Sequence, residues 1–248
     1  MSAGDSITPL ILAGGQGTRI AHLRPDLPKP AVKVAGRPFL CWILGQLREA
    51  GFTRAVVCGG HLADVLEREI STAMPEGISV CWVHEATPLG TAGGAAYAKR
   101  ESGWESTWWL VMNGDSFLEG DWPSKILDQE QPSLVARRID DVSRYGSLQV
   151  HDGLLTALNE KGSSGHGLIN AGIYLLHHDW FDEIPAGVPV SLEQEIIPHW
   201  IASGRRIHVL EQEAPFIDIG TPETLVEADT FFQQPAVPPA NDHHENAI

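Results

Sequence analysis

The sequence predicts an α/β protein with a doubly wound, mostly parallel sheet. Apolar runs alternate with amphipathic stretches as far as about residue 116, which is the pattern of β-α-β units with right-handed crossovers. The first run, Thr8 to Ala13, leads into glycines, as a buried parallel strand does. The 248 residues are enough for one large domain, and no linker or repeat divides them. We therefore expect a single domain over residues 1–232, followed by a polar, proline-rich, flexible tail over residues 233–248.

The first half of the chain is expected to alternate between strands and helices. Pro38 precedes the first helix, and Gly51 is its expected stop, because glycine readily takes the left-handed conformation that ends helices. In order, the expected elements are strand 8–13, helix 39–51, strand 53–60, helix 61–74, strand 78–85, helix 90–101 and strand 106–115. This succession predicts the parallel part of the sheet.

The second half is expected to form a small β subregion and two more helices. Asp152-Gly153 has the composition of a hairpin turn. Ser191 and Thr221 are expected to cap the helices, with Pro222 in the first turn of the last one. In order, the expected elements are strands 132–139, 146–153, 154–160 and 167–177, helix 191–204, strands 205–212 and 214–220, and helix 221–232.

Composition excludes several classes of function. The formal net charge of −15 makes nucleic acid and anionic membrane surfaces poor partners. The three cysteines, Cys41, Cys58 and Cys81, lie in apolar segments, so we expect buried thiols and no disulfide framework. The first residues do not resemble a signal peptide, and no stretch is long and apolar enough to span a membrane. We expect a cytoplasmic protein.

The glycine cluster after the first strand predicts a phosphate site. Gly14, Gly15 and Gly17 lie at the carboxyl edge of the sheet, where backbone N–H groups can point at a phosphate. The third glycine of a dinucleotide fingerprint is missing, which argues against an NAD-dependent oxidoreductase. A P-loop would need a lysine directly after the glycines, and none follows until Lys29. A plain tight turn is the structural alternative.

Lys29 lies between Pro28 and Pro30, whose fixed φ angles stiffen the segment. The stretch "GGQGTRIAHLRPDLPKP", residues 14–30, resembles the signature of the sugar-1-phosphate nucleotidyltransferases, with Ile20 and residues 23–25 as mild departures. These enzymes join a nucleoside triphosphate to a sugar 1-phosphate and release pyrophosphate. The resemblance covers residues 8 to about 230 and implies the Rossmann-like nucleotidyltransferase fold, with the small β subregion on the sugar side.

The resemblance also implies roles for individual residues. Arg19 and Lys29 would be catalytic, and Asp115 and Asp218 would hold Mg²⁺, a cation that prefers oxygen ligands. Nucleotide-binding residues would be Leu12, Ala13, Gly14, Gly15, Gly17, Thr18, Glu85, Gly90 and Thr91. Residues binding the sugar phosphate would be Asn113, Gly146, Glu160, Lys161, Asn170 and Gly172. Gly162 replaces the proline that usually follows the lysine of this motif.

The stretch "PLGTAGG" is most similar to the mannose- and heptose-1-phosphate guanylyltransferase branch. The N–H groups at the start of helix 90–101 could face a base or phosphate. Glu85 could accept hydrogen bonds from guanine N1–H and the exocyclic amine, so GTP is favoured, while UTP, CTP and dTTP remain open. A catalytically silent nucleotide-sugar sensor is the alternative from another class. The sequence names no particular sugar, and a homo-oligomer is compatible with the resemblance.

Overall fold

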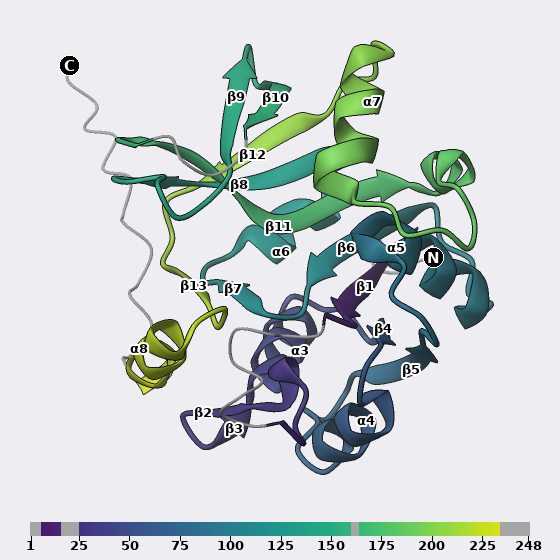
Figure 1. Cartoon of the computed structure of the whole chain (residues 1–248), viewed down its shortest axis with the longest axis vertical. Helices are drawn as coiled ribbons and strands as arrows, with labels where there is room; N and C mark the ends of the chain where they lie inside the picture. Colours follow the sequence, from purple (N-terminus) through teal and green to yellow (C-terminus); the bar gives the residue numbers. More distant parts are fainter. Residues whose placement is uncertain (1–5, 16–24, 160–163, 234–248) are drawn as a thin grey trace, which may run out of the picture.

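A mixed sheet runs through the part of the chain that the structure, a computed structural model, describes: residues 6–15, 25–159 and 164–233. Its strands lie in the order β5 (Ser79–His84), β4 (Arg54–Gly59), β1 (Ile7–Ala13), β6 (Trp108–Asn113), β11 (Gly167–His177), β8 (Ser133–Ile139), β12 (His208–Gln212), β10 (Leu154–Asn159) and β9 (Ser147–His151) (Figure 1). The predicted α/β class is confirmed.

The sheet has a parallel half and a mixed half. Strands β5, β4, β1 and β6 are all parallel, and Ile11 of β1 lies opposite Val57 and Met112. Strand β11 then joins antiparallel to both β6 and β8, whereas β12 returns parallel to β8. Strands β9 and β10 form the predicted hairpin, in which Asp152 and Gly153 have φ angles of 50° and 72°. The antiparallel share is therefore larger than a mostly parallel sheet implies.

Helices cover both faces of the sheet (Figure 1), so its central strands β4, β1, β6 and β11 are mostly buried on both sides. On one face lie α3 (Phe39–Glu49), α4 (Ala63–Ser71), α6 (Trp122–Leu127) and α8 (Pro222–Gln233), packed over a core that includes Ile11 and Trp122. On the other face lie α5 (Gly90–Ser102) and α7 (Ile197–Ala202), packed over a core that includes Leu10 and Trp109. Neighbouring residues of β1 thus belong to opposite cores, which explains its continuous apolar run.

The predicted helix boundaries are largely confirmed. Helix α3 ends at Glu49, and Gly51 follows with a φ of 97°. The Ser191 hydroxyl accepts a hydrogen bond from the backbone N–H of Gln194, at the start of the π-helical turn η3 (Leu192–Ile196) that leads into α7. The Thr221 hydroxyl likewise accepts from the N–H of Thr224 at 3.3 Å. Both residues cap their helices, as expected.

Several short elements were not predicted. One of them pairs with a strand that lies within the predicted strand 214–220, and this pair places part of the site. Strand β7 (Ser116–Leu118) pairs with β13 (Phe216–Asp218), and Asp218 lies opposite Ser116. The other short elements are η1 (Lys29–Ala31), β2 (Lys33–Val34), β3 (Arg37–Pro38) and η2 (His178–Glu183). Cys41 and Cys58 are buried as expected, and Cys81 is half-buried. Among the described residues, no helix is long and apolar enough to cross a membrane.

Candidate functional site

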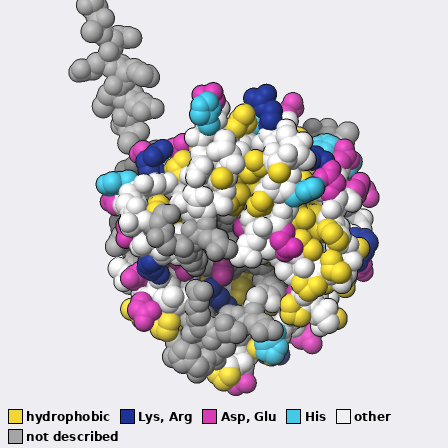
Figure 2. All heavy atoms as spheres, turned by 45° about the horizontal axis from the view of Figure 1, so that its top comes forward, with side chains coloured by type: hydrophobic (Ala, Val, Ile, Leu, Met, Phe, Trp, Pro, Cys, Tyr) yellow, Lys and Arg dark blue, Asp and Glu magenta, His cyan; other side chains and the backbone are white. Residues whose placement is uncertain are grey.

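A cavity of about 320 Å³ opens where β1 and β6 end. Most of its lining comes from positions that the sequence analysis had marked. The lining residues are Leu12, Ala13, Gly14, Gly15, Lys29, Pro30, Cys58, Glu85, Pro88, Gly90, Thr91, Asn113 and Asp115. A hollow near the middle of one face, with acidic and basic side chains both visible, can be followed in Figure 2. The cavity thus lies at the carboxyl edge of the parallel strands, which is where the fold class predicts a ligand site, and we take it as the candidate site.

Two of the three predicted loop glycines lie at the cavity, and they differ in their surroundings. A Cβ at Gly14 would stand 3.1 Å from Glu85 Oε1 and 3.3 Å from the nitrogen of Gly60, so this position is crowded. A Cβ at Gly15 would have nothing within 4 Å among the described residues. The crowding explains the first glycine, and the open space beside the second leaves room for a ligand. Gly17, Thr18 and Arg19 lie outside the described residues.

Glu85 follows β5 and presents a half-buried carboxylate to the cavity. A Cβ at Gly94 of α5 would stand only 2.8 Å from Glu85 Oε2, and the Cys58 Sγ lies 3.9 Å from the same oxygen. Burial raises the pKa of Glu85, while hydrogen bonds from the Leu89 backbone and the Cys58 thiol oppose that rise. A desolvated carboxylate of this kind gains most from a ligand that offers it N–H donors.

The start of α5 differs from the prediction. The N–H groups of Ala92 and Gly93 both donate to the carbonyl of Val190, at 3.0 and 3.4 Å. The Thr91 hydroxyl donates to Glu193 Oε2 at 2.7 Å and accepts from the N–H of Leu192 at 2.7 Å. The expectation that the helix N–H groups face a ligand is thus wrong for these two. A segment far along the chain caps the helix, and the sequence gives no local sign of it.

A charged cluster lies at the other end of the cavity. Asp115 follows β6, and the Lys29 Nζ lies 2.6 Å from its Oδ2, with the lysine side chain only 13% exposed. Asp218 ends β13, and its Oδ1 accepts the N–H of Gly220 at 2.9 Å. A Cβ at Gly220 would stand 2.6 Å from Asp218 Oδ1 and 3.7 Å from Lys29 Nζ. Lys29, Asp115 and Asp218 therefore converge, although they are distant in sequence.

These two aspartates fit a hard divalent cation. The β7–β13 pairing and the hydrogen bond from the N–H of Ile219 to the carbonyl of Asp115, at 2.9 Å, place their backbones side by side. Each offers carboxylate oxygens, the donors that Mg²⁺ prefers, and the absence of a side chain at Gly220 lets the Asp218 carboxylate lie close to the backbone there. The donor chemistry thus agrees with the magnesium site that the resemblance implies.

Tyr145 is part of this cluster, although the sequence analysis did not mark it. Its hydroxyl donates to Asp218 Oδ2 at 2.8 Å. Burial, and then the negative charge of Asp218, raise the pKa of Tyr145 to about 12, so the hydroxyl stays a donor. A tyrosine in a loop has no periodicity that could mark it, and its only local sign is its position directly before Gly146.

The predicted sugar-side residues are only partly brought together. Asn113 lines the cavity, and a Cβ at Gly172, whose φ is 73°, would collide with the Asn113 amide. The Asn170 Nδ2 donates to the Tyr174 hydroxyl at 2.6 Å, and its Oδ1 accepts from the N–H of Gly172 at 2.9 Å. Gly146 packs against the carbonyl of Asn159. Glu160 and Lys161 lie outside the described residues.

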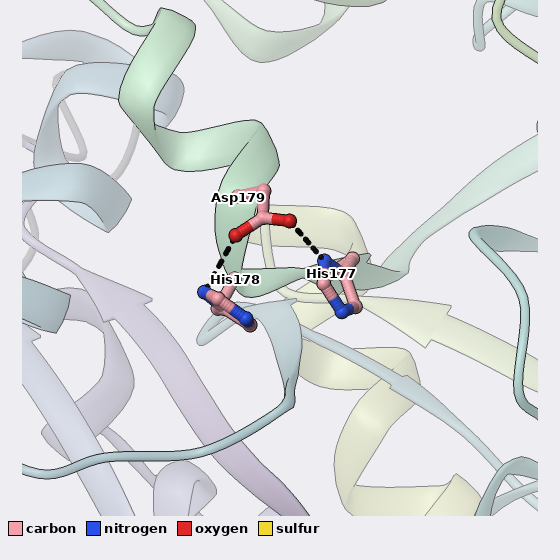
Figure 3. Close-up of side chains that lie close together, drawn as sticks. All are labelled: His177, His178 and Asp179. Carbon is pink, nitrogen blue, oxygen red and sulfur yellow. Dashed lines mark ion pairs between the residues drawn. The ribbon is translucent and has the colours of Figure 1, made fainter.

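A second group of metal-ligand type, His177, His178 and Asp179, is separate from this cavity. Figure 3 shows the Asp179 carboxylate between the two imidazoles, and its oxygens lie 3.3 Å from His177 Nδ1 and 2.9 Å from His178 Nδ1. His177 pairs with Trp108, the first residue of β6, whereas the cavity lies beyond the last residue of that strand. The cluster therefore lies at the amino end of β6, and the cavity lies at the carboxyl end of the same strand.

Known proteins match nearly the whole chain. The family model described as "Nucleotidyl transferase" matches residues 8–235. A Campylobacter jejuni protein named "D-glycero-alpha-D-manno-heptose 1-phosphate guanylyltransferase" is 30% identical over 219 residues, which cover 86% of this chain and 95% of that protein. A Drosophila melanogaster protein named "Mannose-1-phosphate guanylyltransferase catalytic subunit beta" is 31% identical over 234 residues, which cover 91% of this chain. The chain spans only 62% of that relative's length.

Solved structures agree with the family match. The crystal structure of HddC from Yersinia pseudotuberculosis superposes with a TM-score of 0.81 at 32% identity, and covers 91% of this chain and 99% of that one. The same protein is also solved in complex with GMP-PN. The fold, the cavity at the carboxyl edge of the sheet and these matches lead to one conclusion: the chain belongs to the nucleotidyl transferase family.

Proposed function

We propose that the chain is a sugar-1-phosphate guanylyltransferase, which transfers GMP from GTP to a mannose- or heptose-type sugar 1-phosphate and releases pyrophosphate. The observation that carries the proposal is one cavity lined by both the Glu85 carboxylate and the Lys29–Asp115 pair. The first group suits a base, and the second suits phosphates. The names of the relatives from C. jejuni and D. melanogaster support the same reaction.

The base preference rests on the chemistry of Glu85. A carboxylate can accept from guanine N1–H and the exocyclic amine together, which makes a charge-assisted pair. Uracil and thymine offer one N–H, and cytosine presents an acceptor that the carboxylate would repel. Glu85 is partly desolvated, so its carboxylate has lost hydrogen bonds to water. A base that supplies both N–H donors best replaces those hydrogen bonds. GTP is therefore the proposed nucleotide, with UTP, CTP and dTTP as the alternatives.

The phosphate chemistry requires positioning and neutralisation of charge rather than a covalent intermediate. A sugar-phosphate oxygen attacks the α-phosphorus, the bond to the pyrophosphate oxygen breaks, and pyrophosphate leaves. The attacking monoester has a second pKa near 6 and is mostly a dianion at neutral pH, so no general base is needed. Lys29 offers its charge to the crowded phosphates, and we assign Arg19 to the leaving pyrophosphate. Mg²⁺ held by Asp115 and Asp218 would withdraw charge from the phosphates.

The acceptor side is proposed to lie toward β11. Asn113 reaches the cavity directly, and its amide packs against Gly172, which needs no side chain there. Asn170 is held by the Tyr174 hydroxyl and the Gly172 N–H, so its orientation is fixed before a ligand arrives. Glu160 and Lys161 remain the proposed partners of the sugar hydroxyls and the sugar phosphate, and Gly146 remains a proposed residue of the same site.

Pyrophosphate release tests the proposal. GTP, UTP, CTP and dTTP are each combined with glucose, mannose and heptose 1-phosphates, and kcat/KM is measured for every pair that turns over. We expect GTP to exceed UTP by roughly tenfold or more, on the order of 1–3 kcal/mol for a bidentate contact. Glu85→Gln should narrow that ratio and leave the Mg²⁺ dependence unchanged. A preference for UTP or dTTP would contradict the guanine assignment, and nucleotide binding without turnover would favour the sensor.

A further inference from the structure

The two carboxylates of the proposed metal site are held differently. Among the described residues, the Asp115 side chain has one partner, the Lys29 ammonium, which lies 2.6 Å from Oδ2. Asp218 has a partner on each oxygen: the N–H of Gly220 at 2.9 Å on Oδ1 and the Tyr145 hydroxyl at 2.8 Å on Oδ2. A carboxylate held through both oxygens cannot rotate about its terminal torsion without losing one hydrogen bond. Asp218 is thus the more firmly oriented of the two.

The tyrosine that holds Asp218 is itself fixed by its surroundings. Its ring packs edge-on against Phe216, two residues before Asp218 on the same strand, with ring centroids 6.0 Å apart. The guanidinium of Arg144 lies over the Tyr145 ring, 5.8 Å from its centroid. The N–H of Tyr145 donates to the carbonyl of Val142 at 2.9 Å, which closes a turn in the loop between β8 and β9. The hydroxyl is therefore presented from a formed loop.

The loop that carries Tyr145 belongs to the acceptor side of the cavity. Gly146 follows directly, and β9 begins at Ser147, next to the hairpin strand that ends at Asn159. The hydrogen bond to Asp218 thus joins the acceptor-side hairpin to the β7–β13 pair that carries the metal ligands.

We propose that Tyr145 is a positioning residue for the metal centre: its hydroxyl fixes the Asp218 carboxylate in the orientation that binds the cation and links that orientation to the acceptor-side loop. The inference rests on the proposed function, because Asp218 must be a metal ligand. Outer partners of ligating carboxylates typically change metal affinity by about 10–100-fold when they are removed. Loss of the Tyr145 hydroxyl should therefore lower the affinity of the site for the metal ion without removing a ligand.

Mn²⁺ binding to the nucleotide-free protein tests this without turnover. Free Mn²⁺ is counted by its electron paramagnetic resonance signal in titrations of the wild type, Tyr145→Phe, Tyr97→Phe and Asp218→Asn. Tyr97 is a matched control, because it lies on α5 and its hydroxyl contacts only the His84 carbonyl, at 3.4 Å, among the described residues. We expect the dissociation constant for Mn²⁺ to rise about tenfold in Tyr145→Phe and to stay unchanged in Tyr97→Phe. In Asp218→Asn we expect Mn²⁺ binding to be lost.

A second readout separates positioning from a general defect of the loop. In Tyr145→Phe, the Mg²⁺ concentration for half-maximal activity should rise about tenfold, while kcat at saturating Mg²⁺ returns to within about twofold of the wild type. A loop that has merely lost its structure would not be rescued by metal. A Tyr145→Phe protein that binds Mn²⁺ as the wild type does overturns the inference while the metal site stands. If Asp218→Asn binds Mn²⁺ normally, the proposed metal site itself is wrong, and the inference falls with it.

Discussion

At the scale of single residues, the candidate site contains only a few charged side chains of opposite sign among the described residues. Asp115 and Asp218 bring two negative charges, and Lys29 offers one positive charge to the same space. The lysine side chain is mostly buried, so its ammonium depends on the nearby carboxylate more than on water. A chain with a net charge of −15 must hold polyphosphates through such local cations, backbone N–H groups and a metal. Neutralising either sign should therefore have a large effect on the reaction.

Asparagine at either metal position should slow catalysis strongly. Asp115→Asn and Asp218→Asn keep the shape of the side chain and remove an anionic oxygen ligand, so we expect each to lower kcat/KM by roughly 100-fold or more. Circular dichroism should show a native fold. Asp64→Asn, at a side chain that is 93% exposed on α4, is the control. Normal turnover of either variant at limiting Mg²⁺ would rule out the two-aspartate site.

Lys29→Met tests the role of the buried ammonium. The change keeps an unbranched side chain of similar length and removes its charge, which matters most when the α-phosphate is crowded in the transition state. We expect kcat to fall far more than GTP affinity, as shown by steady-state kinetics and equilibrium binding. Lys125→Met, an exposed pair partner of Asp121 on α6, serves for comparison. A rise in KM for GTP at constant kcat would assign Lys29 to binding alone.

At the scale of elements, the junction of α5 with the segment before η3 shapes the nucleotide side of the cavity. The Val190 carbonyl accepts from the N–H groups of Ala92 and Gly93, and the N–H of Val190 donates to the carbonyl of Leu89 at 2.8 Å. The Thr91 hydroxyl adds a contact to Glu193. Gly90 makes this approach feasible, because a Cβ there would collide with the Val190 carbonyl.

Gly90→Ala should separate α5 from that segment. Its matched control is Gly187→Ala, because both glycines have a φ of 72° but a Cβ at Gly187 meets nothing within 4 Å. The control isolates the cost of the left-handed conformation, about 1 kcal/mol. We expect Gly90→Ala to lose at least 2 kcal/mol more than the control in urea denaturation, and to bind GTP more weakly. Equal losses for the two variants would contradict the close approach.

The elements also show how far the sequence determines the site. Long apolar runs with glycine or proline at their ends, such as β1 and α3, were predicted because local preference and burial agree there. The pairing of β7 with β13 was not, because three-residue strands carry no periodicity and their partners are far apart in sequence. The hydrogen bonds from α5 to the Val190 carbonyl and from Tyr145 to Asp218 were also missed, because each joins residues that are far apart in sequence. Asp115 and Asp218 were recognised through the family resemblance rather than through spacing.

At the scale of the whole molecule, the two cores of the sheet position a partly buried carboxylate in the cavity. The two cores contain large side chains such as Trp122 and Trp200, both fully buried, and they hold the ends of the parallel strands in place. Glu85 follows one of these strands, and burial raises its pKa from the ordinary value of 4.5. The folded protein then retains a proton at a pH where the unfolded chain has lost it. The contribution of Glu85 to stability therefore falls as pH rises above about 4.5, because the charged form of this side chain is disfavoured in the fold.

Glu85→Gln should therefore stabilise the protein while weakening its base preference. The variant carries no charge to desolvate, so its free energy of unfolding should exceed that of the wild type at pH 7.5, and the difference should shrink toward pH 4. Urea denaturation at the two pH values measures this. Glu76→Gln, at an exposed position before β5, should show no such pattern. A variant less stable than the wild type at pH 7.5 would mean that the Glu85 contacts outweigh its burial.

The two-stranded pair β7–β13 has a consequence for the nascent chain. Ser116–Leu118 leaves the ribosome long before Phe216–Asp218, and chains are made from the N-terminus onward. The parallel strands and the cavity wall can form early, but the second carboxylate arrives only with the last part of the domain. The charged cluster cannot assemble before the segment that carries Asp218 has been made, so the proposed chemistry cannot begin earlier.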